Sequence, residues 1–159
     1  MPSPAPRKSL LRKRASRLAA VQALYSEALI ERKTAPALLV AQLLQSWADS
    51  RTYDTTDLPH ATQPEAALLN TLVETAQKHA AEIEPAIDAL ILPGWSKERT
   101  SLPLLSVLRT FGAEAIAYPD RAAAMLVDEY TEVAAQLVTD DELNYAHKAF
   151  NLLLKALRR

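Results

Sequence analysis

Residues 9–32 read SLLRKRASRLAAVQALYSEALIER. Apolar side chains recur along this stretch every three to four residues, which is the spacing that places them on one face of a helix. That apolar stripe consists of Leu11, Leu18, Val21, Tyr25, Ala28 and Leu29. We therefore predict a long amphipathic helix over residues 9–32 that packs one face against a core.

The rest of the chain repeats this helical patterning, with proline and polar residues at the boundaries. Strand-like alternation is nearly absent, and only two glycines occur, which disfavours hairpins. Ser101 and either Thr139 or Asp140 are predicted helix N-caps, and Pro85 is predicted to break a helix. Helices are predicted over 36–47, 64–84, 85 to about 92, 103–116, 121–137 and 140–157, with a polar loop over 49–63. We predict an all-α bundle of about seven helices in a single domain.

The composition limits the kinds of site that the chain can hold. It has 159 residues, 49% of them hydrophobic, and no cysteine, so a core is expected and disulfides and thiolate metal sites are excluded. The three histidines, His60, His79 and His147, are far apart and lack metal-ligand spacing, so we predict no metal and no cofactor. No apolar run is long enough to span a membrane and no signal peptide is recognisable, so a cytoplasmic protein is the simplest interpretation.

The overall net charge of −1 hides an asymmetry in where the charges lie. Six of the 18 Lys and Arg residues fall between Arg7 and Arg17, and the first acidic residue is Glu27. The rest of the chain has the remaining 12 basic residues and all 19 acidic ones. A cationic segment on an acidic body favours a polyanionic partner, with nucleic acid as the leading candidate. Residues 1–8 are predicted to be a disordered basic arm ahead of a folded domain over 9–159.

The cationic segment contains the candidate phosphate contacts Arg12, Lys13, Arg14 and Arg17. Lys13 and Arg17 are four residues apart, so both fall on one edge of a helix that can follow a phosphate backbone. Tyr25 lies two turns further on and is a candidate for stacking on an unpaired base. The alternatives are that the cations are only solvated and that Tyr25 belongs to the core with its hydroxyl exposed.

The carboxylates and histidines do not form the pattern of a catalytic site. Glu129 and Glu132 are three residues apart, and we interpret them as solvated or ion-paired rather than as an acid–base pair. His147 is interpreted as a surface or packing residue. Arg109 and Glu114 lie in an apolar segment, where ion pairs or cap bonds that fix helix packing are favoured over RNA contact. The sequence therefore favours a binding module over an enzyme, with no catalytic residue.

Four motifs, in the same order along the chain, resemble those of the NusB family of bacterial transcription antitermination factors. Residues 13–26, KRASRLAAVQALYS, are similar to the family's basic opening helix with its Ala-Val/Leu-Gln-Ala-Leu-Tyr run. Residues 95–114 contain WSKER, VLR and a Glu, similar to the family's Trp-Ser-x-x-Arg, Ile/Val-Leu-Arg and Glu. VDEYTEVA at 127–134 and HKAFNLLL at 147–154 resemble Ile-Asn-Glu-Ala-Ile-Glu-Leu-Ala and His-Lys-Phe-Val-Asn-Gly-Val-Leu.

The resemblance implies an all-α fold of two helical halves and no catalytic activity. It implies that the chain binds the boxA sequence of ribosomal RNA leader transcripts as single-stranded RNA, together with NusE, a small-subunit ribosomal protein that doubles as a transcription factor. That complex joins RNA polymerase and other Nus factors, suppresses termination and supports ribosomal RNA transcription. The candidate RNA-binding residues are Arg7, Lys8, Arg12, Lys13, Arg14, Arg17, Tyr25, His147, Lys148 and Asn151.

Several positions depart from the family's pattern. Leu104 and Leu105 stand where the family has an acidic residue and a polar or basic one, and we expect them to be extra core or an apolar contact patch for a partner. Tyr145 replaces a common Asp, and the region around Tyr145 to Ala149 is one that the family uses near RNA. The other departures are Leu18 for Glu, Ala122 for Pro, Ala149 for Phe and Leu152 for Gly.

Two alternative functions compete with RNA binding in an antitermination complex. A protein-interaction module of NusB fold that has lost boxA specificity would bind NusE, or self-associate, through the apolar patch at Leu104. A NusB-like domain ahead of a ribosomal RNA methyltransferase is disfavoured, because the sequence stops at Arg159 without a cofactor-binding domain. Family members occur as monomers and as dimers, so the resemblance leaves both a monomer and a homodimer open.

Overall fold

The computed structural model describes residues 8–31, 33–50, 62–90 and 100–158. These residues form seven α-helices and no β-strand, which confirms the predicted all-α class. The helices are α1 (Lys8–Leu29), α2 (Pro36–Ser50), α3 (Ala66–Lys78), α4 (Ala80–Asp88), α5 (Leu102–Ala117), α6 (Ala123–Ala135) and α7 (Asp140–Leu157). None of these helices is both long enough and apolar enough to cross a membrane.

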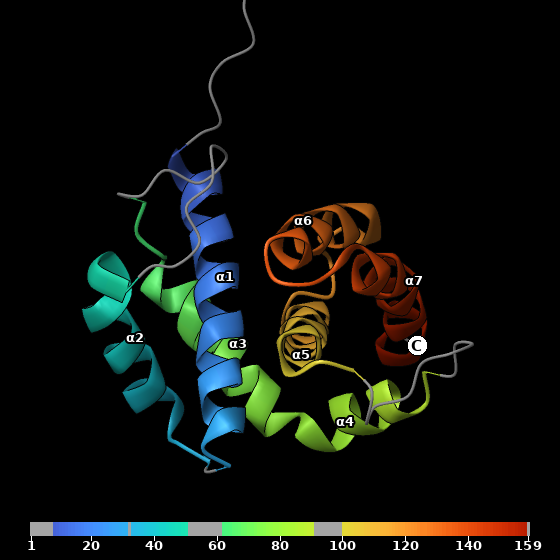
Figure 1. Cartoon of the computed structure of the whole chain (residues 1–159), viewed down its shortest axis with the longest axis horizontal. Coiled ribbons are helices and arrows are strands. Elements are labelled where there is room, and N and C mark those ends of the chain that lie inside the picture. Colours follow the sequence, from blue (N-terminus) through green and yellow to red (C-terminus); the bar gives the residue numbers. More distant parts are fainter. Residues whose placement is uncertain (1–7, 32, 51–61, 91–99, 159) are drawn as a thin grey trace, which may run out of the picture.

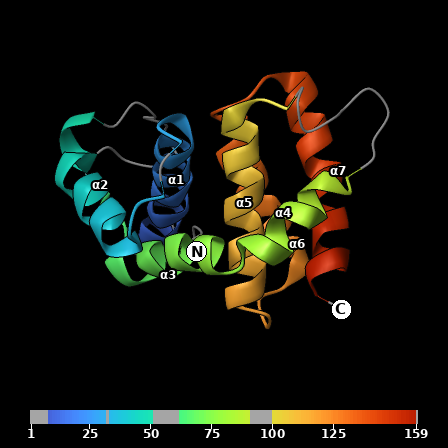
Figure 2. The same cartoon turned by 90° about the horizontal axis from the view of Figure 1, so that it is seen from below.

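The helices form two groups that meet along α5 (Figure 1). In both Figure 1 and the perpendicular view of Figure 2, α1, α2 and α3 lie together on one side, and α4, α6 and α7 lie around α5 on the other. α5 packs against α1 and α3 of the first group and against α4, α6 and α7 of the second. A helix with neighbours on every side is apolar all round, and eleven of the 16 residues of α5 are buried.

The central place of α5 decides the two alternatives for Leu104 and Leu105. The side chain of Leu104 is 0% exposed and that of Leu105 is 8% exposed, so both belong to the core. The expectation that they form an apolar contact patch for a partner is therefore wrong. Gly112 is a point of close approach, because an added Cβ there would lie 3.3 Å from both Ile83 and Leu157. A side chain at 112 would require Ile83 of α4 and Leu157 of α7 to shift.

Local side-chain chemistry fixes the start of α5 and α7 as predicted. Ser101 has an extended backbone, and its Oγ accepts a hydrogen bond from the backbone N–H of Leu104 at 3.3 Å. Thr139 caps α7 through a capping box, in which its Oγ1 accepts from the N–H of Glu142 and the Glu142 carboxylate accepts from the N–H of Thr139. Of the two residues considered for the α7 cap, Thr139 is the correct one.

The predicted helix break at Pro85 is wrong. The chain bends at His79, and Pro85 lies inside α4 on its exposed side. The proline removes the hydrogen bond to the carbonyl of Ala81, which is also exposed and can bond to water instead. The bend falls at His79 because α3 packs against α1 and α5, whereas α4 packs against α5 and α7. Hydrophobic periodicity does not show this change of neighbours.

The apolar stripe of α1 is only partly buried. Leu18 and Val21 are 1% and 2% exposed, as predicted, whereas Leu29 is 57% exposed, against the prediction. Leu29 is the last residue of α1, three residues before the predicted end at 32, and Glu31 just beyond it has a φ of 52°. That left-handed backbone turns the chain away from the helix axis.

Some predicted features fall outside the described residues. Lys8 is the first residue of α1, so the predicted arm is at most residues 1–7, and these, including Arg7, lie outside the description. The same holds for most of the predicted loop over 49–63 and for the predicted helix end near Leu92.

Candidate nucleic-acid interface

The cationic segment forms the first turns of α1, where its side chains differ in what they contact. Lys8 is exposed and Lys13 is half-buried, and neither bonds to any residue within the described ranges. Arg12 donates from Nε to the carbonyl of Gln63 at 3.3 Å and from Nη2 to that of Pro64 at 3.2 Å, which ties α1 to the chain ahead of α3. Because those carbonyls are neutral, these two bonds leave the positive charge of Arg12 uncancelled, and no described carboxylate pairs with it.

Arg14 and Arg17 instead form ion pairs with the second group of helices. Arg14 donates from Nε and Nη2 to the two carboxylate oxygens of Glu129 in α6, at 3.2 and 3.4 Å. Arg17 donates from Nε and Nη2 to Glu114 in α5, both at 2.8 Å, and its side chain is 2% exposed. The prediction that Arg17 contacts phosphate is therefore wrong, because its guanidinium is buried and already bound to a carboxylate. Lys13 and Arg17 therefore do not form a pair of cations along a phosphate backbone.

Glu114 is the centre of the buried polar network between the two groups of helices. Its carboxylate accepts hydrogen bonds from Arg17, from Nη1 of Arg121 at 2.7 Å and from the hydroxyl of Tyr130 at 2.7 Å. Glu114 and Tyr130 are both 0% exposed. A buried carboxylate is tolerated only when it is paired and hydrogen-bonded, and Glu114 meets that condition through donors from α1, α6 and the turn after α5.

The network sets the protonation states of its members. Burial alone raises the pKa of Glu114, but its hydrogen bond and charge interaction with Arg17, with bonds from Tyr130 and Arg121, outweigh burial and hold that pKa below its ordinary value. For Arg17 burial alone lowers the pKa, and Glu114 outweighs it, so that pKa is raised. Burial, with the charge of Glu114, raises the pKa of Tyr130. At neutral pH the network is a charged carboxylate held by two guanidinium groups and a phenol.

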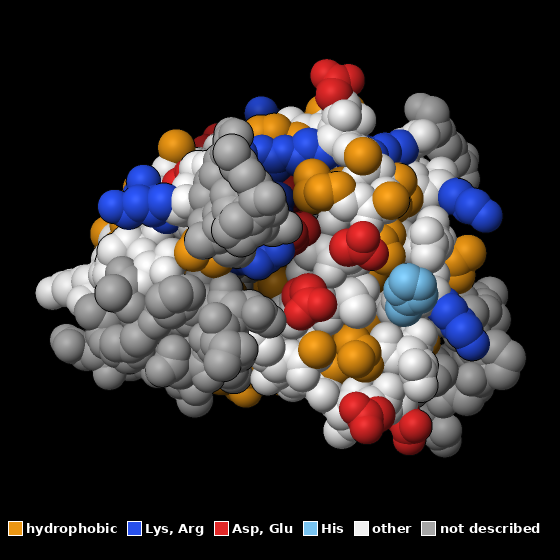
Figure 3. Space-filling model, turned by 90° about the horizontal axis from the view of Figure 1, so that it is seen from above, with side chains coloured by type: hydrophobic (Ala, Val, Ile, Leu, Met, Phe, Trp, Pro, Cys, Tyr) orange, Lys and Arg blue, Asp and Glu red, His pale blue; other side chains and the backbone are white. Residues whose placement is uncertain are grey.

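Cations on the side of the molecule formed by the N-terminal part of α1, α6 and α7 are dispersed. Figure 3 shows Lys and Arg side chains on this side at separate places, with Asp, Glu and apolar side chains between them. Among the described residues in this view, the cations therefore occupy individual places rather than one continuous basic patch.

The candidate residues of α7 share one exposed face, whereas Tyr25 lies far along α1. His147, Lys148 and Asn151 are exposed, and the amide of Asn151 donates to the carbonyl of His147 at 3.1 Å. Tyr25 is half-buried. It lies about 18 Å along the helix axis from Lys13, at 1.5 Å per residue. The structure thus brings the three α7 residues together and separates Tyr25 from the free lysines.

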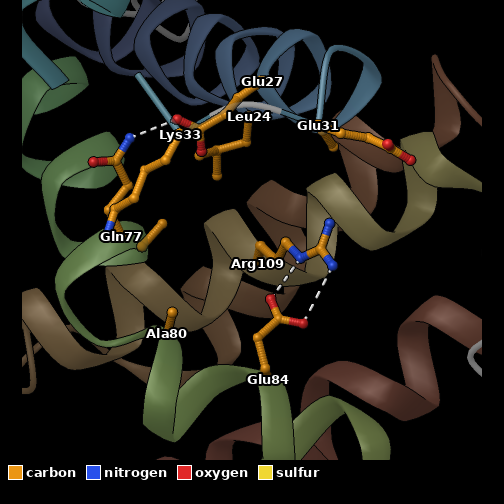
Figure 4. Close-up of a pocket in the computed structure, with 10 residues that line it drawn as sticks. Leu24, Glu27, Glu31, Lys33, Gln77, Ala80, Glu84 and Arg109 are labelled. Carbon is orange, nitrogen blue, oxygen red and sulfur yellow. Dashed lines mark hydrogen bonds and ion pairs between the residues drawn. The ribbon is translucent and has the colours of Figure 1, made fainter. Parts of the chain in front are cut away.

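A pocket of about 360 Å³ lies where the end of α1 meets α3, α4 and α5 (Figure 4). On its wall Arg109 of α5 donates from Nε and Nη2 to the carboxylate of Glu84 in α4, at 2.6 and 3.2 Å. Across the pocket Glu27 of α1 accepts from the amide of Gln77 in α3 at 2.8 Å. These contacts, with those of Glu114, confirm the interpretation that Arg109 and Glu114 fix helix packing.

Sequence reasoning missed most partners in these contacts. Glu84, Arg121 and Tyr130 were given no role, and no motif or spacing distinguishes them from solvated side chains. Arg158 was missed as well, although it donates to the carbonyls of Ala115, Tyr118 and Arg121 and so binds the C-terminal end of α5. Among the residues that the structure describes, no group of three His, Asp or Glu side chains is placed to hold a metal ion.

Comparison with known proteins places the chain in a family. A sequence model of the NusB family matches residues 14–145. Transcription antitermination protein NusB of Maricaulis maris is 28% identical over 156 residues, which cover 98% of this chain and 93% of that protein. The protein of the same name from Sphingopyxis alaskensis is 30% identical over 145 residues, covering 91% and 93%.

A solved structure extends the comparison to the fold. NusB of T. maritima superposes with a TM-score of 0.68 over 98% of this chain and 93% of that chain, at 20% sequence identity. The relatives are named for transcription antitermination, which is a regulatory function and not a catalytic one. The match of a family model to most of the chain, with 93% of each of the two relatives covered, shows that the chain belongs to the NusB family of transcription antitermination proteins.

Proposed function

We propose that this chain binds the boxA segment of ribosomal RNA leader transcripts, as single-stranded RNA, together with NusE in the antitermination complex of RNA polymerase. The observation that carries the proposal is the pair of lysines at the start of α1. Lys8 and Lys13 have no partner within the described ranges, yet they project from a helix that the buried Arg17–Glu114 pair fixes to the rest of the protein. Pre-positioned, unpaired cations are what phosphate binding requires.

The other candidate residues take separate roles in this proposal. Arg12, whose bonds to described residues are all to neutral carbonyls, adds a positive charge in the same segment as the two lysines, and Arg7 extends that segment toward the N-terminus. Exposed polar side chains of α7 and the ring of Tyr25 supply contacts to unstacked bases. The remaining site residues in this scheme are His147, Lys148 and Asn151. Because each phosphate contact is weak alone, NusE raises the affinity by joining a second weak RNA site to the first.

The test is a titration of fluorescent boxA RNA and a scrambled control with this protein, with and without NusE from the same organism, at two salt concentrations. We expect boxA to bind more tightly than the scrambled RNA, more tightly again with NusE, and less tightly at high salt. Equal and weak binding to both RNAs, unchanged by NusE, would contradict the proposal and favour a NusB-fold protein-interaction module without boxA specificity.

Replacing both free lysines should weaken RNA binding in a way that salt reveals. Each phosphate contact to a single strand contributes about 0.7 to the slope of log affinity against log salt. The variant Lys8→Ala/Lys13→Ala is therefore expected to flatten that slope by about 1.4 and to lower affinity roughly tenfold at low salt. Fluorescence anisotropy over a salt series measures both quantities.

A matched double variant separates local contacts from net charge. Lys33→Ala/Lys78→Ala also removes two positive charges, from exposed lysines just beyond the end of α1 and in the last turn of α3. We expect this control to change affinity much less. Equal losses in the two double variants would show that only the net charge of the protein matters and would remove the start of α1 from the interface.

A further inference from the structure

We propose that Glu129 competes with RNA phosphate for Arg14 and so sets the affinity of the RNA surface. The inference rests on the proposed function, because it requires phosphates to reach the start of α1. Arg14 lies in the same cationic segment as Lys13 but is not free, since its guanidinium is bound to the Glu129 carboxylate of α6. In the protein without RNA, a cation that belongs to the binding surface is thus held by an internal anion.

The bonds between Arg14 and Glu129 are looser and more accessible than the others in the network. Their lengths are 3.2 and 3.4 Å, whereas both bonds between Arg17 and Glu114 are 2.8 Å. Charge-assisted bonds of this kind are usually about 2.7–2.9 Å long. The side chain of Arg14 is 30% exposed, against 2% for Arg17. A phosphate can therefore approach Arg14 from solvent, and the carboxylate that it must displace is weakly held there.

A second observation shows where the Glu129 carboxylate goes when Arg14 leaves. Nη1 of Arg17 is buried and has no hydrogen-bond partner among the described residues. That nitrogen lies 3.6 Å from Oε2 of Glu129, which is an ion-pair distance slightly too long for a hydrogen bond. Once phosphate binds Arg14, the carboxylate is free to close this gap and accept the missing bond from Arg17. A buried donor without an acceptor is unfavourable, so the exchange recovers part of what the release of Arg14 loses.

Arg14, Arg17 and Glu129 are paired both with and without RNA, and the two states differ in which arginine Glu129 binds. Without RNA, Glu129 bonds to Arg14 and stands near Arg17; with RNA, phosphate bonds to Arg14 and Glu129 bonds to Arg17. Arginine suits this exchange because its planar fork matches a carboxylate and a phosphate equally well. Glu129 therefore lowers the RNA affinity of the protein without occluding its surface.

The test removes the competing charge while keeping an acceptor for Arg17. The variant Glu129→Gln is expected to bind single-stranded RNA about threefold to tenfold more tightly at low salt, because phosphate no longer has to displace a carboxylate from Arg14. The salt slope should stay the same, because Arg14 contacts phosphate in both complexes. The matched control is Glu132→Gln, which removes the same charge from an exposed residue of the same helix that forms no side-chain bond in the described structure. A general charge effect would strengthen both variants equally.

The dependence on Arg14 completes the test. In an Arg14→Ala background the gain from Glu129→Gln should fall to that of Glu132→Gln. A gain that persists without Arg14, or that matches the control with Arg14 present, overturns the proposal. Wild-type protein labelled with ¹⁵N gives a readout independent of the variants' folding: RNA should shift the side-chain resonances of both Arg14 and Arg17. An Arg17 resonance unmoved at saturating RNA likewise overturns it.

Failure of this inference and failure of the proposed function give different results. The boxA preference and the NusE effect are measured on the wild-type protein, whereas the gain through Arg14 is measured on the scrambled RNA as well. Loss of boxA preference with a retained Arg14-dependent gain would overturn the proposed function alone. Binding of boxA with no such gain would overturn the role of Glu129 alone, and no RNA binding at all would overturn both.

Discussion

Replacing Glu114 with alanine is expected to lower the free energy of unfolding by about 3–5 kcal/mol, because the change leaves the buried guanidinium of Arg17 without its anion. Arg17 is 2% exposed and Glu114 is 0% exposed, so water cannot take over the lost bonds. Tyr130 and Arg121 lose their acceptor at the same time. Urea unfolding followed by circular dichroism measures the change, provided that the dependence of stability on urea keeps the wild-type slope.

A half-buried pair that is also bidentate gives the control for Glu114. Glu84 also accepts two bonds from one arginine, Arg109, but its side chain is 31% exposed. Solvent reaches and screens this pair, whereas it does not reach Arg17 and Glu114, so Glu84→Ala should cost less than Glu114→Ala. Similar losses would mean that burial of the Arg17 pair adds nothing to its importance.

The dependence of stability on pH offers a second readout of Glu114. Because its pKa is lower in the folded protein than in the unfolded chain, the stability it contributes is fully present above the ordinary value of 4.5. That contribution is lost as the pH falls through the lowered folded-state pKa. Between neutral pH and acid, the wild-type protein should therefore lose more stability than Glu114→Ala does. If the free energies of unfolding of the wild type and Glu114→Ala fall in parallel as the pH is lowered, Glu114 is not charged in the folded protein.

The fold was largely predictable because its signals are local. Ser101 and Thr139 mark helix starts through short-range chemistry that any sequence window contains, and the apolar spacing in residues 9–32 marks a buried helical face. The bend at His79 was missed because its cause is not local. It depends on which helices lie beside α3 and α4, and Pro85 offered a stronger but misleading local signal.

The candidate site was less predictable, and Arg17 shows why. In the sequence it is one more cation of a basic run, and its spacing to Lys13 suits a phosphate track as well as any other. Its burial follows from Glu114, which lies 97 residues away and reaches it only through the packing of α1 on α5. Charge patterning therefore identified a cationic segment but could not separate Lys8 and Lys13, which have no partner among the described residues, from Arg17, which is buried in an ion pair.

Replacing Phe150 with alanine is expected to cost about 3–5 kcal/mol of stability, because the ring is fully buried and the site has little room to collapse. Phe150 stacks on Phe111 with ring centroids 4.5 Å apart, and Tyr130 meets both rings edge-on. Thermal unfolding should show a fall in the midpoint of roughly 10 °C or more. The control is Leu152→Ala, on the same helix but at a side chain that is 39% exposed, and it should change the midpoint only slightly. Equal shifts in the two variants would contradict the assignment of Phe150 to the core.

Tyr130 joins this aromatic cluster to the buried charge network. A substitution in the cluster should therefore weaken the hydrogen bond from Tyr130 to Glu114. Its ring packs on Phe111 and Phe150 while its hydroxyl donates to Glu114. In the wild-type background Tyr130→Phe removes a bond to a buried charge, which is worth about 1.5–3 kcal/mol. After Phe150→Ala the ring of Tyr130 is no longer held in place, and the same substitution should cost less. If the stability losses of Tyr130→Phe and Phe150→Ala simply add, Glu114 and its arginines alone position the Tyr130 hydroxyl. The aromatic cluster would then support α7 without helping to hold α1 in place.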